Sequence, residues 1–508
     1  GDLAGVRAHL DYLKELGVDA LWFTPWYASP LADGGYDVSD YRQIHPAFGD
    51  IHEAEALIRE ALAVGIRTII DVVPNHVSHE HEWFTAALAA GPGSPERERF
   101  WFHPGVGPNG DGMPPHWVSI APGDTRTGTT NPDGTPGEWY LHLFTPEQPD
   151  LNWNHPDVRK EHEDVLRFWF DRGVAGVRID SAALLVKDPS LPEVSGDEGP
   201  GEHPNTDRDE VHDIYRSWRA VADSYPGTRV LVGEVWMPDP VRFTNYLRAD
   251  EMHTAFNFDF MARPWKGSEL RESIDSMLAA HAPVGAPSTW VLSNHDVTRT
   301  VTRYGREDSS FAFATKRFGT PSDLALGTRR ARAAALLSAA LPGSLYVYQG
   351  DELGLPEVED LPEGARQDPM HFRSHGVDPG RDGCRVPLPW GGDRPPFGFS
   401  TGDRQPWLPQ PEDWGRYSVE AEAADPGSML SLYRSALAIR RTLEGDESFR
   451  WLGSEPDVLC FSRGGGFVSV TNLSDRPIDL PEHREFLLGS AELVDGRLAP
   501  DSTAWLRA

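Results

Sequence analysis

The chain has 508 residues, of which 39% are hydrophobic, 10% aromatic and 25% charged, so it can bury a large core and disorder as its main state is excluded. Its formal net charge of −31 repels phosphate backbones and anionic lipid, which argues against nucleic-acid and membrane-surface partners and suits a neutral substrate. Its two cysteines provide neither a disulfide framework nor a CxxC metal motif, and no apolar run is long enough to span a bilayer, so we expect a cytoplasmic protein.

The first predicted element is a helix over residues 3–16, where apolar residues recur at steps of three and four before Gly17. A strand, ALWFTPWY, follows, and the alternation of helix and strand then continues along the chain. Six further strands are predicted at IRTIIDVVPNH, VAGVRIDSA, RVLVGEVW, AFNFDF, STWVLSNHD and SLYVYQGDELG. Strands rich in Val, Ile and aromatic residues between helical segments are typical of parallel β/α units.

These elements predict an α/β fold, a (β/α)8 TIM barrel whose first strand is expected upstream of residue 1. Two stretches interrupt the alternation: one rich in Gly, Pro and polar residues, and one with short strand-like runs near the C-terminus. The predicted organisation is a catalytic barrel over 1–76 and 151–446, an inserted domain over 77–150 after the third strand, and a C-terminal antiparallel β domain over 447–508.

Polar residues gather at the predicted C-terminal ends of the strands, which face the active-site mouth of a β/α barrel. They are Asp71, Asn75, His76, Arg178, Asp180, Glu234, His295 and Asp296. Glycosidic cleavage needs a nearby carboxylate pair, one protonated and one ionised. Arg178 lies on the strand face of Asp180 and is predicted to hold Asp180 ionised, while neighbouring carboxylates are predicted to raise the pKa of Glu234.

The segments DVVPNH, GVRID, GEVW and SNHD occur in this order and resemble the four signature segments of glycoside hydrolase family 13, the α-amylase family. QPDLN, at 148–152, resembles a fifth segment as it appears in the oligo-1,6-glucosidase and α-glucosidase branch. GGYDVSDYR, HTAFNFDF and GRDGCRVPLPW are similar to α-glucosidases of actinobacterial type. The resemblance covers nearly the whole chain.

The resemblance implies a role for each matching residue. Asp180 would be the nucleophile that forms a glucosyl-enzyme, Glu234 the general acid/base, and Asp296 the third carboxylate, which binds and distorts the ring. The anomeric configuration would be retained. The implied substrate-binding residues are Asp33, Tyr36, His76, Arg178, His295 and Arg381, of which Asp33 and Arg381 would close the pocket around the non-reducing end.

The implied function is that of an exo-acting α-glucosidase acting on maltose and short oligosaccharides. Ser181 and Ala182 after the nucleophile favour α-1,4 over α-1,6 linkages. One alternative is a transglucosylase or isomerase, of trehalose or isomaltulose synthase type, which uses the same carboxylates. Another is a non-catalytic binding protein similar to the ectodomains of amino-acid transporter heavy subunits, against which the three intact carboxylates argue.

No cofactor is required for this reaction in the family. Most of the acidic metal-binding loop of α-glucosidases would lie before Gly1, and only Asp2 of it is present. The sequence therefore leaves a structural Ca²⁺ or Mg²⁺ ion open, and it does not determine the oligomeric state.

Overall fold

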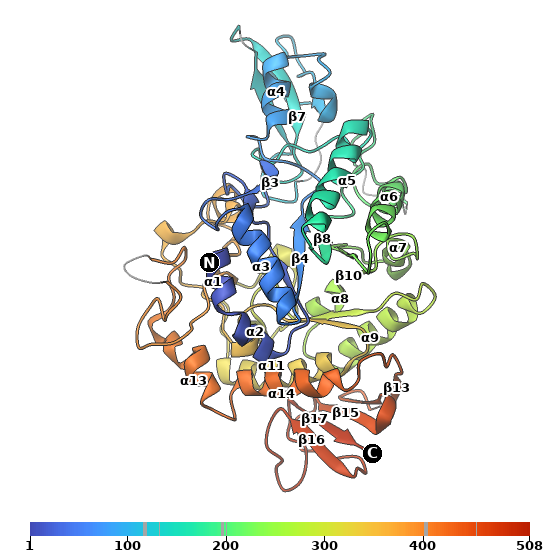
Figure 1. The fold of residues 1–508 in the computed structure, drawn as a ribbon, viewed down its shortest axis with the longest axis vertical. Helices are drawn as coiled ribbons and strands as arrows, with labels where there is room; N and C mark the ends of the chain where they lie inside the picture. The colour runs from blue at the N-terminus through green and yellow to red at the C-terminus, as the bar shows by residue number, and fades with distance from the viewer. Residues whose placement is uncertain (115–118, 132, 195–197, 200, 401–404, 454) are drawn as a thin grey trace.

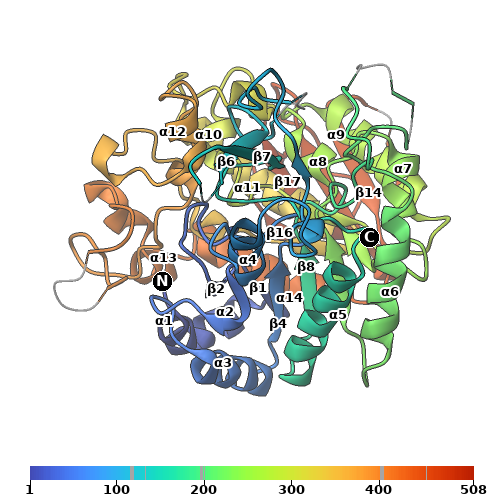
Figure 2. The same ribbon diagram turned by 90° about the horizontal axis from the view of Figure 1, so that it is seen from above.

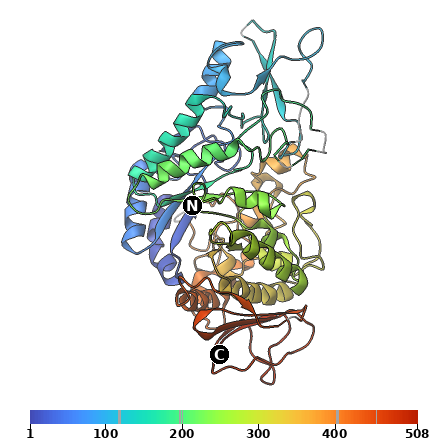
Figure 3. The same cartoon turned by 90° about the vertical axis from the view of Figure 1, so that its right-hand side faces the viewer.

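The computed structural model describes residues 1–114, 119–131, 133–194, 198–199, 201–400, 405–453 and 455–508. Parallel strands surrounded by helices form its centre, an inserted segment projects at one end, and a small sheet lies at the other (Figure 1). Figure 3 shows the same three parts from the side. The centre holds the polar strand ends on which the site is built.

The central strands form two parallel sheets. The first has the order β1-β4-β8-β9-β10, and the second pairs β11 with β12. The strands are β1 (Ala20–Phe23), β4 (Arg67–Val72), β8 (Gly176–Ile179), β9 (Val230–Gly233), β10 (Thr254–Ala255), β11 (Thr289–Val291) and β12 (Ser344–Tyr346). Thr289 joins the two sheets, because its Oγ1 accepts the Asn257 N–H at 2.9 Å and donates to the Ala255 carbonyl at 2.7 Å. All seven predicted strands of the barrel are present in the part of the chain that the structure describes.

Helices cover the outside of these strands (Figure 2). They are α1 (Leu3–Ala8), α2 (Leu10–Leu16), α3 (Ile51–Ala63), α5 (Pro156–Asp171), α6 (Val211–Asp223), α7 (Pro240–Asn245), α9 (Gly267–His281), α11 (Leu324–Ala340) and α14 (Met429–Arg441). Helix α5 shows how sequence sets this packing: Pro156 opens it, and Val158, Val165 and Trp169 lie on its buried face. The alternation of parallel strands and outer helices confirms the predicted α/β barrel.

Two predicted elements differ in detail. The helix expected over residues 3–16 is broken at His9 into α1 and α2. The expected strand AFNFDF ends at Ala255, since Asn257 accepts the Phe260 N–H and caps a short helix, α8 (Phe258–Ala262). Asn and Asp favour such caps over continued strand, and this local bond outweighs the aromatic strand signal.

The segment after β4 forms a separate small unit. It contains α4 (Glu82–Ala90) and a three-stranded antiparallel sheet, in the order β5-β7-β6, where the sequence shows little periodicity. Its strands are β5 (Phe102–His103), β6 (Arg126–Thr130) and β7 (Pro136–Leu141). The bridge between His76 and Asp150 returns the chain to the barrel mouth. The domain bounds of 77 and 150 stay a prediction.

The C-terminal strands form an antiparallel sheet in the order β13-β14-β15-β17-β16. They are β13 (Arg450–Trp451), β14 (Val458–Ser462), β15 (Phe467–Asn472), β16 (Glu485–Gly489) and β17 (Ser502–Arg507). This sheet packs on α11, where Thr503 Oγ1 donates to the Ala333 carbonyl at 2.9 Å and Trp505 Nε1 to the Leu336 carbonyl at 3.2 Å. It is therefore remote from the polar strand ends.

Further short elements are β2 (Tyr27–Ala28), β3 (Asp40–Ile44), α10 (Thr300–Tyr304), α12 (Pro369–Arg373) and α13 (Val419–Ala423). β2 and β3 pair antiparallel just after β1. The segment around α12 returns to the barrel mouth, where it brings Asp368 and Arg381 to the site.

Candidate active site

Arg178 lies at the centre of a group of three carboxylates. The parallel register pairs Asp71 of β4 with Arg178 of β8, so the two side chains lie next to each other. Arg178 Nη1 donates to Asp71 Oδ1 at 3.0 Å and to Asp180 Oδ1 at 2.6 Å, while Nη2 lies 2.7 Å from Glu234 Oε2. We call these four residues the Arg178 cluster. Three carboxylates from three neighbouring strands, β4, β8 and β9, thus share one guanidinium group.

Glu234 is held by two further donors. Its Oε2 accepts the backbone N–H of Ser181 at 2.9 Å, and its Oε1 accepts Trp236 Nε1–H, also at 2.9 Å. Ser181 adopts a φ of 46°, which is rare for a residue with a side chain and marks local backbone strain beside the site. This turn directly after Asp180 directs the Ser181 N–H toward Glu234.

Burial raises the pKa values of the three carboxyl groups in the Arg178 cluster. The pKa of Asp180 rises to about 6, chiefly because burial disfavours its charge, and Arg178 opposes this rise. The pKa of Glu234 rises to about 7 through burial and then the charges of Asp180 and Asp296, and that of Asp71 also rises to about 7. From the sequence, Arg178 is predicted to hold Asp180 ionised and neighbouring carboxylates to raise the pKa of Glu234; in the structure both pKa values are raised, and that of Asp180 lies below that of Glu234.

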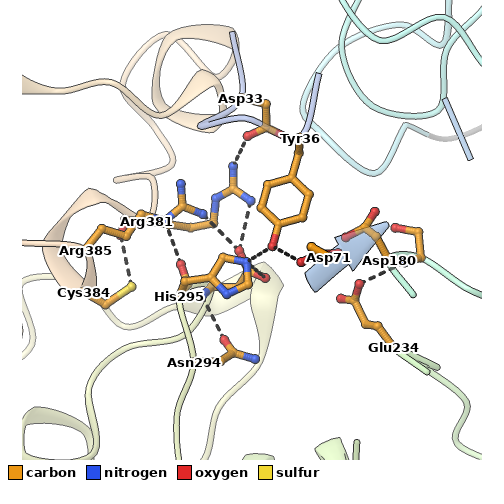
Figure 4. A network of polar contacts seen from close by, with 12 residues as sticks. Asp33, Tyr36, Asp71, Asp180, Glu234, Asn294, His295, Arg381, Cys384 and Arg385 are labelled. Carbon is orange, nitrogen blue, oxygen red and sulfur yellow. Dashed lines mark hydrogen bonds and ion pairs between the residues drawn. The ribbon is translucent and has the colours of Figure 1, made fainter. Parts of the chain in front are cut away.

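A second group surrounds Arg381, which extends from the segment after α12. Its Nη2 donates to Asp33 Oδ1 at 2.7 Å and its Nη1 to Asp296 Oδ1 at 3.1 Å. Asp368 accepts Arg381 Nε–H at 2.7 Å and Nη2–H at 2.9 Å, and Arg385 Nη2 donates to Asp296 Oδ1 at 3.1 Å. These five residues are the Arg381 cluster, of which Figure 4 labels Asp33, Arg381 and Arg385.

Charge balance in the Arg381 cluster favours ionised carboxylates. Burial acts to raise the pKa of Asp296, but His295, Arg381 and Arg385 outweigh it and hold that pKa well below its usual range. The pKa of Asp368 is also held low, because Arg381 outweighs the effect of burial. Asp296 therefore stays charged throughout the range in which Glu234 exchanges its proton.

Tyr36 and His295 connect the two clusters (Figure 4). The Tyr36 hydroxyl donates to Asp71 Oδ2 at 3.0 Å, so its oxygen is free to accept the Nε2–H of His295 at 2.8 Å. His295 Nε2 also lies 3.4 Å from Asp296 Oδ2, and burial lowers the pKa of His295 to about 3. A neutral His295 protonated on Nε2 satisfies both contacts.

His76 is fixed by buried polar contacts on both ring nitrogens. Its Nε2 lies 3.0 Å from the Tyr36 carbonyl, and its Nδ1 lies 3.1 Å from Asn75 Nδ2. Asn75 is bound in turn by Lys187, whose Nζ lies 2.5 Å from Asn75 Oδ1 and 2.8 Å from Asp150 Oδ2. Lys187 and Asp150 are fully buried, so this contact anchors His76 rigidly.

The structure brings all nine sequence-predicted site residues together. Contacts run from His76 and Tyr36 through Arg178, Asp180 and Glu234 to His295, Asp296, Arg381 and Asp33. The roles assigned to them stay predictions.

Four members of the site were not predicted from the sequence. Asp71 was placed at the barrel mouth without a role, and Trp236, Asp368 and Arg385 were passed over. Arg385 and Trp236 each lie within a quoted motif, four and two residues from a predicted site residue. No local signal marks Asp368, which reaches Arg381 only through the path of its loop.

Within the described ranges, no group of three or more His, Cys, Asp or Glu residues could hold a metal ion. No helix among the same residues is both long and apolar enough to cross a membrane.

Comparisons with known proteins cover nearly the whole chain. A family model described as the α-amylase catalytic domain matches residues 1–445. An oligo-1,6-glucosidase of Parageobacillus thermoglucosidasius is 31% identical over 559 residues, covering 98% of this chain and 93% of that protein. An α-glucosidase of Apis mellifera is 30% identical over 501 residues, covering 94% and 82% of the two chains. The solved structure of an isomaltulose synthase from Klebsiella sp. LX3 superposes with a TM-score of 0.85 at 25% identity, covering 100% of this chain and 95% of that one.

Proposed function

The chain belongs to the α-amylase family, glycoside hydrolase family 13, and from this premise we propose that it is an exo-acting α-glucosidase releasing terminal glucose from maltose and short oligosaccharides. Enzymes of this family retain the anomeric configuration and need no cofactor. The observation that carries the proposal is the pair of buried carboxylates, Asp180 and Glu234, on the two Nη atoms of Arg178.

In the first step, a carboxylate oxygen of Asp180 attacks C1 of the terminal glucose while Glu234 gives its proton to the glycosidic oxygen. The bond between C1 and that oxygen breaks, and the remaining sugar leaves as an alcohol. The order of the two pKa values supports these roles, because Asp180 ionises at a lower pH than Glu234.

In the second step, ionised Glu234 takes a proton from water, and the water oxygen attacks C1 of the glucosyl-enzyme. The bond from C1 to Asp180 breaks, which restores both carboxyl groups to their starting states. Two inversions at C1 give glucose with its original configuration. Arg178 contacts both carboxyl groups and can stabilise whichever one carries the negative charge.

The neighbouring polar residues form the pocket for the terminal glucose. Tyr36 offers a ring face, and the ring nitrogens of His76 and His295, which bond to protein groups in this structure, would exchange such a bond for one to a sugar hydroxyl. Asp296 is ionised and can accept two hydroxyl hydrogens, which suits a carboxylate that distorts the ring. The ion pair between Asp33 and Arg381, at 2.7 Å, closes one end of this pocket, which supports release of single glucose units.

We infer a preference for α-1,4 linkages from Ser181, a small hydroxylated residue directly after Asp180. The strained Ser181 backbone donates to Glu234, so the residue lies next to the group proposed to protonate the leaving sugar. Glucose release from maltose, isomaltose, sucrose and p-nitrophenyl α-glucoside tests both parts of the proposal. We expect maltose to be cleaved fastest; a folded protein that releases no glucose from any of the four would refute the α-glucosidase function.

A second candidate function is transfer of glucose to another sugar. It is favoured by the similarity in structure to an isomaltulose synthase, at a TM-score of 0.85. The same glucosyl-enzyme would react with a sugar hydroxyl instead of water. Product analysis at high maltose or sucrose concentration distinguishes the two, because a transferase accumulates oligosaccharides or sucrose isomers while a hydrolase accumulates glucose.

A further inference from the structure

Trp236 lies two residues after Glu234 and donates its Nε1–H to Glu234 Oε1 at 2.9 Å. Its ring is stacked on Phe258, with centroids 3.7 Å apart and planes 2° from parallel, and it meets the edge of Phe313 at 4.9 Å. The residue is nevertheless 37% exposed. Stacking thus fixes an otherwise accessible indole so that its N–H faces the proposed general acid.

The two oxygens of Glu234 have different surroundings. Oε2 accepts the Ser181 N–H at 2.9 Å and lies 2.7 Å from Arg178 Nη2, so two donors occupy its two lone pairs. Among the described residues, the donor recorded to Oε1 is Trp236. A proton on Oε2 would displace the cation or the backbone donor, whereas Oε1 has a lone pair to spare. The geometry therefore distinguishes the two oxygens as sites for a proton.

We propose that Oε1 of Glu234 carries the proton given to the glycosidic oxygen, and that Trp236 is the positioning residue that orients this oxygen. The inference rests on the proposed role of Glu234 as general acid. The indole N–H occupies one lone pair of Oε1 and leaves the other for the transferred proton. Rotation of the carboxyl group is blocked at both ends, by Trp236 on one oxygen and by Ser181 and Arg178 on the other.

Trp236 also affects proton release. When Glu234 has given up its proton, the indole N–H donates to a charged oxygen, and hydrogen bonds to charged groups are stronger than those to neutral ones. The contact therefore favours the ionised state and opposes the effect of burial on Glu234. Loss of the indole N–H should make Glu234 a weaker acid as well as a less oriented one.

The test is Trp236→Phe, which keeps an aromatic ring for stacking and removes the donor. We expect the basic limb of the pH profile of kcat/KM to move upward by about one pH unit, since a hydrogen bond to a charged group is worth roughly that shift. We also expect kcat/KM for maltose to fall roughly tenfold, whereas that for p-nitrophenyl α-glucoside changes little, because its leaving group needs little protonation.

The matched control is Trp451→Phe. Trp451 also donates its indole N–H to a carboxylate, Asp275 Oδ1 at 2.7 Å, but it lies in the C-terminal sheet. The Trp451→Phe variant should leave unchanged both the basic limb of the pH profile and the ratio of kcat/KM for maltose to that for p-nitrophenyl α-glucoside. If folded Trp236→Phe keeps the wild-type limb, or loses activity equally on both substrates, the inference is overturned.

Failure of this inference and failure of the proposed function are distinguishable, because wild-type activity on the two substrates tests the function alone. Circular dichroism establishes folding, and Trp236→Leu, which also lacks the donor, replaces the phenylalanine variant if that variant does not fold. The same upward limb and the same selective loss on maltose are expected of it.

Discussion

The Arg178 cluster and the Arg381 cluster are built from the same residue types but balance charge differently. The first places three carboxylates around one arginine, and burial raises all three pKa values. The second places three carboxylates around two arginines, and the pKa values of Asp296 and Asp368 are held low. With one arginine for three carboxyl groups, the Arg178 cluster can hold a proton near neutral pH. The Arg381 cluster, with two arginines, keeps its carboxyl groups ionised.

This difference suits the chemistry proposed for each cluster. Proton transfer needs a group whose pKa lies near the working pH, and only the Arg178 cluster supplies one from Glu234. Holding sugar hydroxyls needs acceptors with permanent charge and fixed position, which Asp296 provides between Arg381 and Arg385. Variants in the first cluster should therefore affect chemistry, and variants in the second should affect binding.

The largest expected effect comes from Asp180→Asn. An amide cannot form the glucosyl-enzyme, so kcat for maltose should fall on the order of 10⁴-fold or more. The fold should persist, because Arg178 keeps Asp71 and Glu234 as partners. Steady-state kinetics and thermal unfolding check both parts, with the surface variant Asp164→Asn as control. Wild-type turnover by Asp180→Asn would remove Asp180 from its proposed role.

Glu234→Gln should have the next largest effect. It removes the proton given to the leaving oxygen, so kcat/KM for maltose should fall by roughly 10² to 10⁴-fold, the usual worth of a general acid. The loss on p-nitrophenyl α-glucoside should be smaller in kcat/KM, because its leaving group departs with little help. A Gln variant that loses equal activity on both substrates would contradict the acid role of Glu234.

A smaller effect, on binding, is expected in the second cluster from Asp368→Asn. The neutral amide weakens the hold on Arg381, so KM for maltose should rise roughly tenfold and the free energy of unfolding should fall by about 1–3 kcal/mol. Asp413→Asn, at an exposed ion pair, serves as control. If kcat fell strongly while KM stayed constant, the division between a chemical and a binding cluster would be wrong.

Much of the barrel and of the site could be predicted from the sequence because the signals are local. The strand ends carrying Asp180, Glu234 and Asp296 lie in short apolar runs, and parallel strands bring such ends to one edge. The contact between Arg381 and Asp33 came only from the resemblance to a family, because 348 residues separate them along the chain.

The remaining features depend on packing that no local pattern encodes. Asp368 binds Arg381 because two loop segments cross at the barrel mouth, with the N–H groups of Gln367 and Asp368 bound to Asp382. His9, at the break of the first helix, stacks on Trp390 with ring centroids 3.7 Å apart, and the sheet of the inserted segment forms by pairing of strands that show little periodicity. The raised pKa of Asp180 depends on the extent of its burial, which could not be weighed against Arg178 without coordinates.

The smallest expected effect is in the pH profile of the unmodified enzyme, which tests whether the Arg178 cluster alone exchanges a proton near neutral pH. Asp180 must be ionised to attack, so kcat/KM should fall as the pH drops below about 6, where the raised pKa of Asp180 lies. Glu234 must be protonated, so kcat/KM should also fall as the pH rises above about 7, its own raised pKa. The two limbs belong to the coupled pair, and each should approach a tenfold change per pH unit.

Asp296 should contribute no limb in this range, because its pKa is held far lower. Asp368→Asn should therefore keep the wild-type profile at a higher KM, whereas Glu234→Gln should lose the basic limb. A basic limb that persists in Glu234→Gln would assign that limb to a group other than Glu234, such as Asp71, and a limb that moves in Asp368→Asn would show that the Arg381 cluster takes part in proton exchange.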